Sequence, residues 1–249
     1  MPKENSTLIA VVLDRSGSMQ PLREATVAGL NQFLRGQREL AGTALLHFVQ
    51  FDDQYEVKRH FEDLKQVPDL TQDDFQPRGS TALLDAIGRT IVEVGARLAS
   101  TPEASRPSKI IFVIQTDGFE NASHEYNYAK IQEMISHQRD KYAWDFVFLG
   151  ANQDAIATGG MLGIQAGATI SYNANALSTQ KTFQMVNRSV ASSRIKGAGG
   201  QAVFTAAAQN YVSNDQVGIN AALDLSLDPV DPSDPSGGAV TPDSSSKGT

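Results

Sequence analysis

Asp14, Ser16 and Ser18 place three oxygen-bearing side chains at alternate positions of one short segment. Alternate residues of a tight loop can direct their side chains toward one point, and Gly17 permits the close turn. Carboxylate and hydroxyl oxygens suit a hard cation such as Mg²⁺, Mn²⁺ or Ca²⁺. A second interpretation is that Ser18 only caps the helix that follows. The segment alone therefore predicts either a divalent-metal site or a polar helix cap.

Two more polar segments stand at comparable places along the chain. Gly79-Ser80-Thr81 precedes a predicted helix, and Thr116-Asp117-Gly118 ends a predicted strand. In open α/β sheets ligands bind at the carboxyl ends of the strands, near the point where the strand order reverses. Both Asp14 and Asp117 follow apolar strands directly. We therefore expect these two carboxylates at the same edge of the sheet.

Together these residues resemble the metal-ion-dependent adhesion site (MIDAS) of the von Willebrand factor A (vWA) domain family. The pattern of that family is Asp-x-Ser-x-Ser, then a Thr in a later loop, then an Asp after a further strand. The matching positions here are Asp14, Ser16, Ser18, Thr81 and Asp117. The resemblance covers about residues 8 to 195 and is closer to compact standalone vWA proteins of bacteria and their phages than to multidomain receptors.

The resemblance also implies a division of roles. Ser16 and Ser18 would ligate the metal through their hydroxyls, and Thr81 would do so directly or through water. Asp14 and Asp117 would mostly hold waters and orient the serines. Neutral hydroxyls leave the cation under-neutralised, so a partner's carboxylate can complete its coordination. Because Mg²⁺ readily keeps water positions, we expect it as the resident ion, with Mn²⁺ or Ca²⁺ as alternatives.

Other polar residues near these segments have less specific roles. We expect Ser80 to cap the following helix, with a supporting hydrogen bond to a metal ligand as the alternative, and we expect Arg15 to point outward. Glu120 and Asn121 are expected either at the rim of the site or as solvated loop residues. The histidines show no metal-ligand spacing and are expected to be ordinary surface or core residues: His47, His60, His124 and His137.

The elements that must hold these segments alternate between strands and helices. Apolar runs predict buried strands, and an Asp-Asp-Gln turn at residues 52–54 predicts a hairpin. The expected strands are 8–13, 43–51, 55–61, 109–115, 144–149 and 168–172, and the expected helices are 21–40, 83–98, 128–138, 154–162 and 177–195. This alternation predicts an α/β fold with a doubly wound, mostly parallel central sheet, flanked by helices in a Rossmann-like arrangement, with one antiparallel edge strand.

The chain is expected to contain one domain and a tail. Residues 1–223 form the predicted vWA-like domain, with a flexible Gly-rich joint at 196–200 and a helical extension over about 201–223. Residues 224–249 are rich in Asp, Pro, Ser and Gly and cannot bury apolar area. They predict a disordered acidic tail.

Composition excludes several classes of function. The 249 residues carry a net charge of −7 and contain no cysteine. The absence of basic runs argues against nucleic-acid binding and against a polybasic membrane patch. No stretch reaches the roughly 20 apolar residues that span a bilayer, and the run at 8–13 is short for a signal peptide. We therefore expect a cytoplasmic protein without disulfides.

The leading hypothesis is a binding module rather than an enzyme, one that recognises an acidic group of a partner protein through its metal. The resemblance implies a partner such as a separate AAA+ ATPase chain or a neighbouring subunit, and leaves the oligomeric state open. One alternative is a metal-dependent phosphohydrolase, which usually needs a second carboxylate two residues after the first and a Lys at the phosphate. Another is a self-assembling structural protein in which Asp228, Asp231 or Asp234 docks on the metal.

Overall fold

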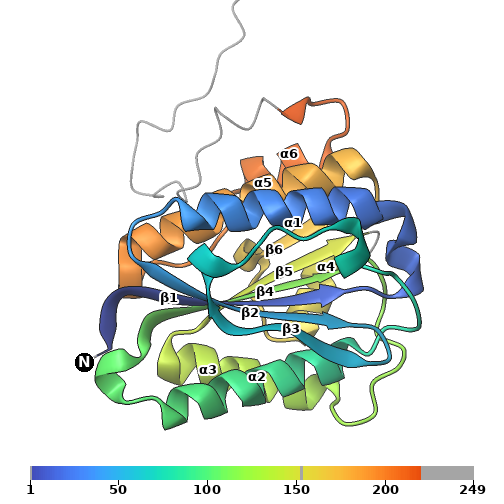
Figure 1. Cartoon of the computed structure of the whole chain (residues 1–249). Helices are drawn as coiled ribbons and strands as arrows, with labels where there is room; N and C mark the ends of the chain where they lie inside the picture. The colour runs from blue at the N-terminus through green and yellow to red at the C-terminus, as the bar shows by residue number, and fades with distance from the viewer. Residues whose placement is uncertain (1, 152–153, 220–249) are drawn as a thin grey trace, which may run out of the picture.

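A computed structural model describes residues 2–151 and 154–219 and contains a central six-stranded sheet in the order β3-β2-β1-β4-β5-β6 (Figure 1). All neighbouring strands pair in parallel except β2 and β3, so β3 is an antiparallel edge strand. The strands are β1 (Lys3–Asp14), β2 (Thr43–Phe51), β3 (Tyr55–Asp63), β4 (Pro107–Thr116), β5 (Asp145–Ala151) and β6 (Thr169–Tyr172). The predicted fold class is confirmed.

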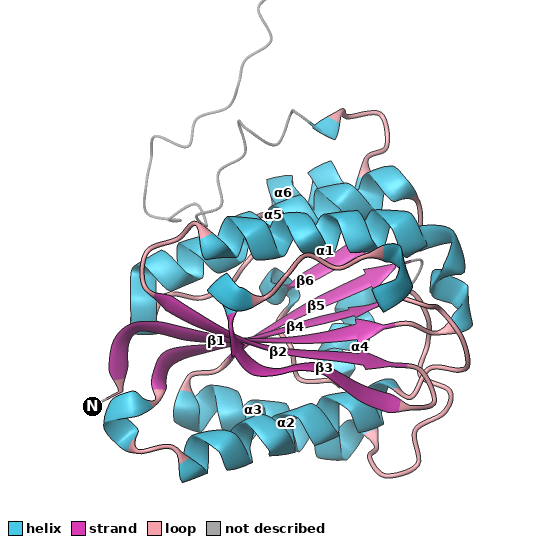
Figure 2. Cartoon of the chain, viewed as in Figure 1, coloured by secondary structure: helices cyan, strands magenta, loops and turns pink. Residues whose placement is uncertain are grey.

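Helices cover both faces of the sheet (Figure 2). On one face lie α1 (Arg23–Arg38), α5 (Ala176–Lys196) and α6 (Ala206–Ser213), and on the other lie α2 (Leu83–Ser100), α3 (Tyr128–Tyr142) and α4 (Ala155–Met161). Within the described part of the chain, no helix is long and apolar enough to cross a membrane. The arrangement is the three-layer, doubly wound sandwich that the alternating pattern predicts.

The apolar run of β1 lies at the centre of this sandwich and feeds both cores. Ile9, Val11 and Leu13 belong to the core beneath α1 and α5. Leu8, Ala10 and Val12 belong to the core beneath α2 and α3. Successive side chains of a strand point to opposite faces, so a strand that is covered on both faces must be apolar throughout. This requirement explains why the run shows no alternation with polar residues.

The sheet register brings the polar segments to one edge. Along β1, Asp14 pairs with Phe51 of β2, and Leu13 pairs with Gln115 of β4. After β1 the chain continues to β2 on one side, and it returns to β4 on the other side, so the strand order reverses between β1 and β4. That point is the usual ligand-binding crevice of such sheets. It lies at the arrowheads of the strands in Figure 1.

Three segments differ from the prediction. The helix expected at 21–40 is a 3₁₀ turn (Gly17–Leu22) followed by α1. The joint expected to be flexible is anchored at its last residue: Gly200 is buried, a Cβ on it would lie 2.3 Å from the carbonyl oxygen of Ser193, and Lys109 Nζ donates a hydrogen bond to the Gly200 carbonyl. The helix expected from residue 201 begins only at Ala206, and the predicted acidic tail at 224–249 lies outside the described residues.

Candidate metal site

Asp14, the last residue of β1, is completely buried beneath the turn that follows it. Its Oδ1 accepts a hydrogen bond of 2.6 Å from the backbone N–H of Ser16, and its Oδ2 accepts one of 2.6 Å from the hydroxyl of Thr116 on β4. Both carboxylate oxygens are therefore held by groups of the site itself. Asp14 fixes the turn and joins it to β4, which fits the orienting role expected for it.

The two serines and Asp117 form a chain of hydrogen bonds above Asp14. The Oγ atoms of Ser16 and Ser18 lie 3.1 Å apart, and Ser18 Oγ donates to Asp117 Oδ1 at 2.6 Å. Ser16 is buried, Asp117 is half-buried and Ser18 is exposed. The oxygens thus lead from the edge of the sheet to the surface. Because Ser18 reaches across to Asp117, it does not act as the helix cap considered from the sequence.

Thr81 belongs to the same cluster and comes from the loop before α2. Its side chain is buried, its N–H donates to Asn121 Oδ1 at 2.9 Å, and its carbonyl accepts from the N–H of Asn121 at 3.0 Å. A Cβ built on Gly118 would lie 3.5 Å from Thr81 Oγ1 and 3.6 Å from Ser18 Oγ. Both hydroxyls therefore face Gly118, so all five predicted residues are brought together.

We call the three segments, residues 14–18, 79–81 and 116–118, the site loops, and backbone contacts join the first two of them. The N–H of Gly17 donates to the carbonyl of Gly79 at 3.2 Å, and the N–H of Arg78 donates to the carbonyl of Arg15 at 2.8 Å. Gly79 has a φ of +67°, a conformation that costs residues with a Cβ additional energy. Glycine at this position therefore permits the two loops to meet.

The electrostatics of the site favour a cation. Burial raises the pKa of Asp14 to about 6, against the opposing hydrogen bonds from Thr116 and Ser16 and with a smaller contribution from the charge of Asp117. Burial also raises the pKa of Asp117. Among the described residues, neither carboxylate forms an ion pair with a Lys or Arg. A divalent ion would supply the missing positive charge.

The donor set fits a hard cation in composition and in spacing. Two carboxylates and three hydroxyls provide only oxygen atoms, which are the ligands of Mg²⁺ and Mn²⁺. In an octahedron with Mg–O distances of about 2.1 Å, adjacent oxygens are about 3.0 Å apart. The Ser16–Ser18 oxygen distance of 3.1 Å is close to this value. The described residues hold no group of three or more His, Asp or Glu side chains suited to a metal, so hydroxyls must contribute if this site binds one.

Arg15 does not point outward, and that prediction was wrong. Its side chain is 4% exposed, its Nε donates to Asp52 Oδ2 at 3.1 Å, and its Nη2 donates to Glu56 Oε1 at 2.7 Å. Arg78 binds the same two carboxylates. The hydrogen bond from Arg15 is the largest effect that lowers the pKa of Glu56, to about 2. Arg15 therefore fastens the first site loop to the β2–β3 hairpin.

The neighbouring polar residues brace the second and third site loops. Glu120 accepts hydrogen bonds from the N–H groups of Leu84, at 3.0 Å, and Ser123, at 2.7 Å, while Asn121 holds Thr81. Glu120 thus caps the first turn of α2. Ser80 does not serve as the cap, because the cap position is Ala82 and no side chain bonds from there.

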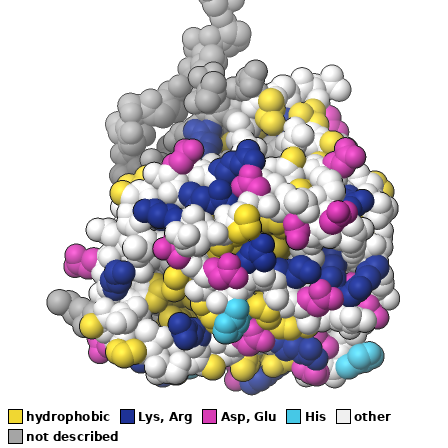
Figure 3. All heavy atoms as spheres, viewed as in Figure 1, with side chains coloured by type: hydrophobic (Ala, Val, Ile, Leu, Met, Phe, Trp, Pro, Cys, Tyr) yellow, Lys and Arg dark blue, Asp and Glu magenta, His cyan; other side chains and the backbone are white. Residues whose placement is uncertain are grey.

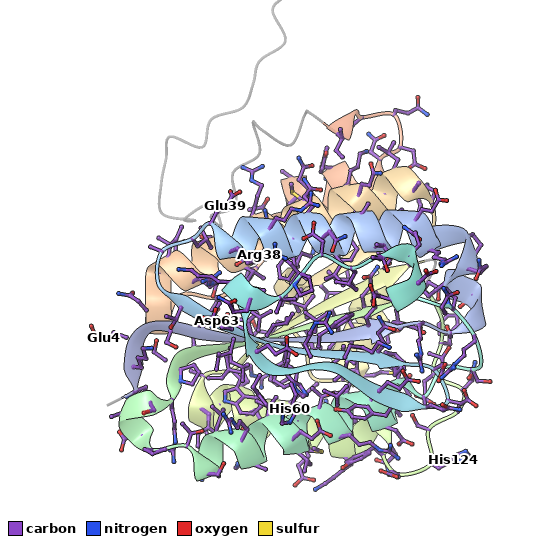
Figure 4. All side chains as sticks on the ribbon, in the orientation of Figure 1. Glu4, Arg38, Glu39, His60, Asp63 and His124 are labelled. Atoms are coloured by element: carbon purple, nitrogen blue, oxygen red, sulfur yellow. The ribbon has the colours of Figure 1, made fainter. Side chains whose placement is uncertain are left out.

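The histidines lie away from the site oxygens, as expected for surface and core residues. His47 is buried on β2 with its ring stacked on Phe61 at 4.4 Å, and burial lowers its pKa to about 4. His60 projects from β3 on the α2 side, and His124 projects outward from the β4–α3 loop (Figure 4). On the face shown in Figure 3, Lys and Arg side chains are interspersed with Asp and Glu.

Sequence reasoning missed two parts of the site. Thr116 stands in the quoted Thr-Asp-Gly segment, but its bond to Asp14 depends on the register of β1 against β4. The Arg15–Asp52 pair joins residues 37 positions apart, and no local pattern indicates it. One signal was available: Arg15 and Asp52 have opposite charges and each follows directly after one of two strands that pair with each other.

Comparison with protein-family models and with curated proteins finds no match. Solved structures with the same architecture do exist at low sequence identity. Proximal thread matrix protein 1 from the mussel byssus is 16% identical with a TM-score of 0.55, over 75% of this chain and 46% of that one. Pilus adhesin SpaC from Lactobacillus rhamnosus GG is 12% identical with a TM-score of 0.56, over 75% of this chain and 31% of that one.

The vWF domain of the type V pili tip protein Mfa5 from Porphyromonas gingivalis is 8% identical with a TM-score of 0.52, over 76% of this chain and 95% of that domain. This chain spans less than half of the mussel protein, for which a further structure has a zinc-occupied MIDAS motif. These likenesses concern the fold. The chain has the fold of von Willebrand factor A domains, as the resemblance of its sequence implies.

Proposed function

We propose that this chain is a protein-binding module in which a divalent cation, held by the site loops, binds an acidic side chain of a partner. The observation that carries the proposal is the oxygen cluster at the strand-order reversal, where Ser16, Ser18 and Asp117 are linked at 2.6 to 3.1 Å. Ser16, Ser18 and Thr81 would hold the ion, while Asp14 and Asp117 would orient hydroxyls and waters. When bound, the ion supplies positive charge that the neutral hydroxyls leave partly unsatisfied.

The exposure of the site supports a ligand that approaches from outside. Asp14 and Thr81 are buried, whereas Ser18 is exposed at the surface. An ion on these oxygens would therefore have protein on one side and solvent on the other. We propose Mg²⁺ as the resident ion and a partner carboxylate as the external ligand, on an AAA+ ATPase or a neighbouring subunit.

The features of the site loops favour binding over phosphoester chemistry. A phosphohydrolase of the kind considered above needs a carboxylate two residues after Asp14, and Ser16 occupies that position. The site loops contain no Lys to stabilise a phosphate. The residues proposed for self-assembly, Asp228, Asp231 and Asp234, lie outside the described residues.

The proposal can be tested by direct titration. Calorimetry with Mg²⁺ and Mn²⁺ should show one site in the wild type and no binding in Ser16→Ala/Ser18→Ala. The matched control is Ser80→Ala, since Ser80 is an exposed serine of the same loops that does not cap α2. The metal-loaded protein should then bind acetyl-aspartyl-amide, and EDTA should abolish that binding. Equal metal affinity in all three proteins, or peptide binding in EDTA, would contradict the proposal, as would turnover of phosphate esters that is lost in Asp14→Ala.

A further inference from the structure

Phe119 is exposed directly beside the candidate metal site. Its side chain is 65% exposed, and it follows Asp117 and Gly118 in the chain. Phenylalanine is normally buried, so a large exposed ring is an informative exception when it adjoins a site. The other large apolar side chains exposed in the described part of the chain lie on helices or on β3: Val57, Val92, Tyr142, Ile156, Met161 and Ile195. Within that set, Phe119 is the one that belongs to a loop.

The backbone on both sides of Phe119 is fixed, although its ring is not packed. The N–H of Gly118 donates to Thr116 Oγ1 at 3.2 Å, and that hydroxyl also bonds the Gly118 carbonyl. On the other side, the N–H groups of Asn121 and Ala122 donate to the carbonyl of Thr81 at 3.0 and 3.2 Å, and the Glu120 side chain accepts from the N–H of Leu84. A ring on such an anchored segment loses little conformational freedom when a ligand covers it, so it suits a preformed contact.

The backbone of Phe119 lies close to the site oxygens. Gly118 lies against the hydroxyls of Thr81 and Ser18, within about 3.6 Å of each at the point where a Cβ would stand. The Cα of Phe119 is one residue further, about 3.8 Å along the chain. Phe119 and the oxygens of the candidate site therefore lie at one corner of the molecule, where the β4–α3 loop meets the other site loops.

We propose that the partner presents to this corner an acidic side chain together with an apolar side chain two positions away, on one face of an extended segment. Residues i and i+2 of an extended segment point to the same side, which lets the carboxylate reach the ion while the apolar group packs on Phe119. The inference rests on the proposed function, because the carboxylate must find a bound cation. It adds the chemistry that selects among acidic partners: the ion accepts carboxylates in general, and Phe119 favours those with an apolar neighbour.

The test uses two blocked pentapeptides, Leu-Gly-Asp-Gly-Leu and Gly-Gly-Asp-Gly-Gly, titrated by NMR into the full chain loaded with Mg²⁺. Covering part of the exposed ring should make the leucine peptide bind about five- to tenfold tighter. Phe119→Ser should bind both peptides with the affinity that the wild type has for the glycine peptide. Tyr142→Ser is the matched aromatic control, because Tyr142 is 52% exposed but ends α3 near the opposite edge of the sheet, and it should keep the preference.

The outcomes separate this inference from the proposed function. Equal affinity of the wild type for the two peptides, or a preference that persists in Phe119→Ser, overturns the role of Phe119. The proposed function still stands in that case if both peptides bind only in the presence of metal. Failure of the Mg²⁺-loaded wild type to bind either peptide overturns both. Binding of both peptides that Ser16→Ala/Ser18→Ala retains also overturns both, because the inference requires the carboxylate to bind the ion that these hydroxyls hold.

Discussion

Replacing Arg15 with methionine will remove a buried positive charge from between two carboxylates. Asp52 is completely buried, and Arg15 lies 3.1 Å from it and 2.7 Å from Glu56. Removing one partner of a buried ion pair costs about 3–5 kcal/mol, because the other charge is left uncompensated. Arg78 still contacts Asp52 at 2.8 Å, so we expect a loss of about 2–3 kcal/mol in the free energy of unfolding. Methionine keeps most of the apolar stem, which limits the loss of packing.

Urea denaturation monitored by fluorescence will measure this loss, since the chain has one tryptophan and that residue, Trp144, is buried. The matched control is Arg35→Met. Arg35 also binds an aspartate, Asp69, but it is 62% exposed, and exposed pairs contribute little. Its replacement should leave the denaturation midpoint unchanged.

Two further measurements make the reasoning refutable. Adding Asp52→Asn to Arg15→Met should recover part of the stability, because the uncompensated charge is then gone. The pKa of Glu56, held at about 2 chiefly by its hydrogen bond from Arg15, should rise in Arg15→Met when it is followed by NMR. An Arg15→Met protein as stable as the wild type, or one that Asp52→Asn destabilises further, would refute the account of this cluster.

Three other predictions concern pH, metal and the glycine turn. Below pH 6.5 the unfolded chain protonates His47 before the folded chain does, so the free energy of unfolding should fall by about 3 kcal/mol as the pH drops toward 4. Asp14 has the opposite effect, because its raised pKa favours the folded state at low pH. The difference between wild type and His47→Phe, measured without metal, cancels the effect of Asp14 and isolates that of His47. Mg²⁺ at a hundredfold excess over its dissociation constant should add about 2.7 kcal/mol to the free energy of unfolding, and a Ser16→Ala/Ser18→Ala protein stabilised equally by Mg²⁺ would contradict the assigned site. Gly79→Ala should cost about 1–2 kcal/mol because φ is +67° there and the new Cβ would lie 2.4 Å from Asp53 Oδ1; unchanged stability on chemical denaturation would show that this turn is not constrained.

The sequence predicted the sheet well because a parallel strand that is buried on both faces must be apolar along its whole length, and such a run is easily recognised. The run from Leu8 to Leu13 must be covered on both faces, and its continuous apolar character indicates this without any knowledge of the partners. The edge strand β3 follows from a short polar turn between two apolar segments. The close approach of Asp14 and Asp117 follows from their places after parallel strands.

Details that depend on pairing between distant residues were beyond local patterns. The orientation of Arg15 depends on Asp52 and Glu56, which lie 37 and 41 positions away. The anchoring of Gly200 depends on Lys109, 91 positions away, which carries the hydrogen bond that holds it. Glycine-rich sequence indicates conformational freedom in the unfolded chain, whereas the contacts that remove this freedom are set by the tertiary fold. The structure shows that the five site residues lie close together. Their metal-binding roles stay predictions.

The link from Asp14 to Thr116 joins positions 102 residues apart, and the link from Ser18 to Asp117 joins positions 99 residues apart. The cluster therefore cannot assemble until β4 has docked beside β1, a step that closes a long loop and is slow in folding. An ion that needs both halves would contribute little before that docking, so it should slow unfolding more than it accelerates folding. Stopped-flow kinetics with and without Mg²⁺ would then make the cation a probe for the moment at which the two halves of the sheet join.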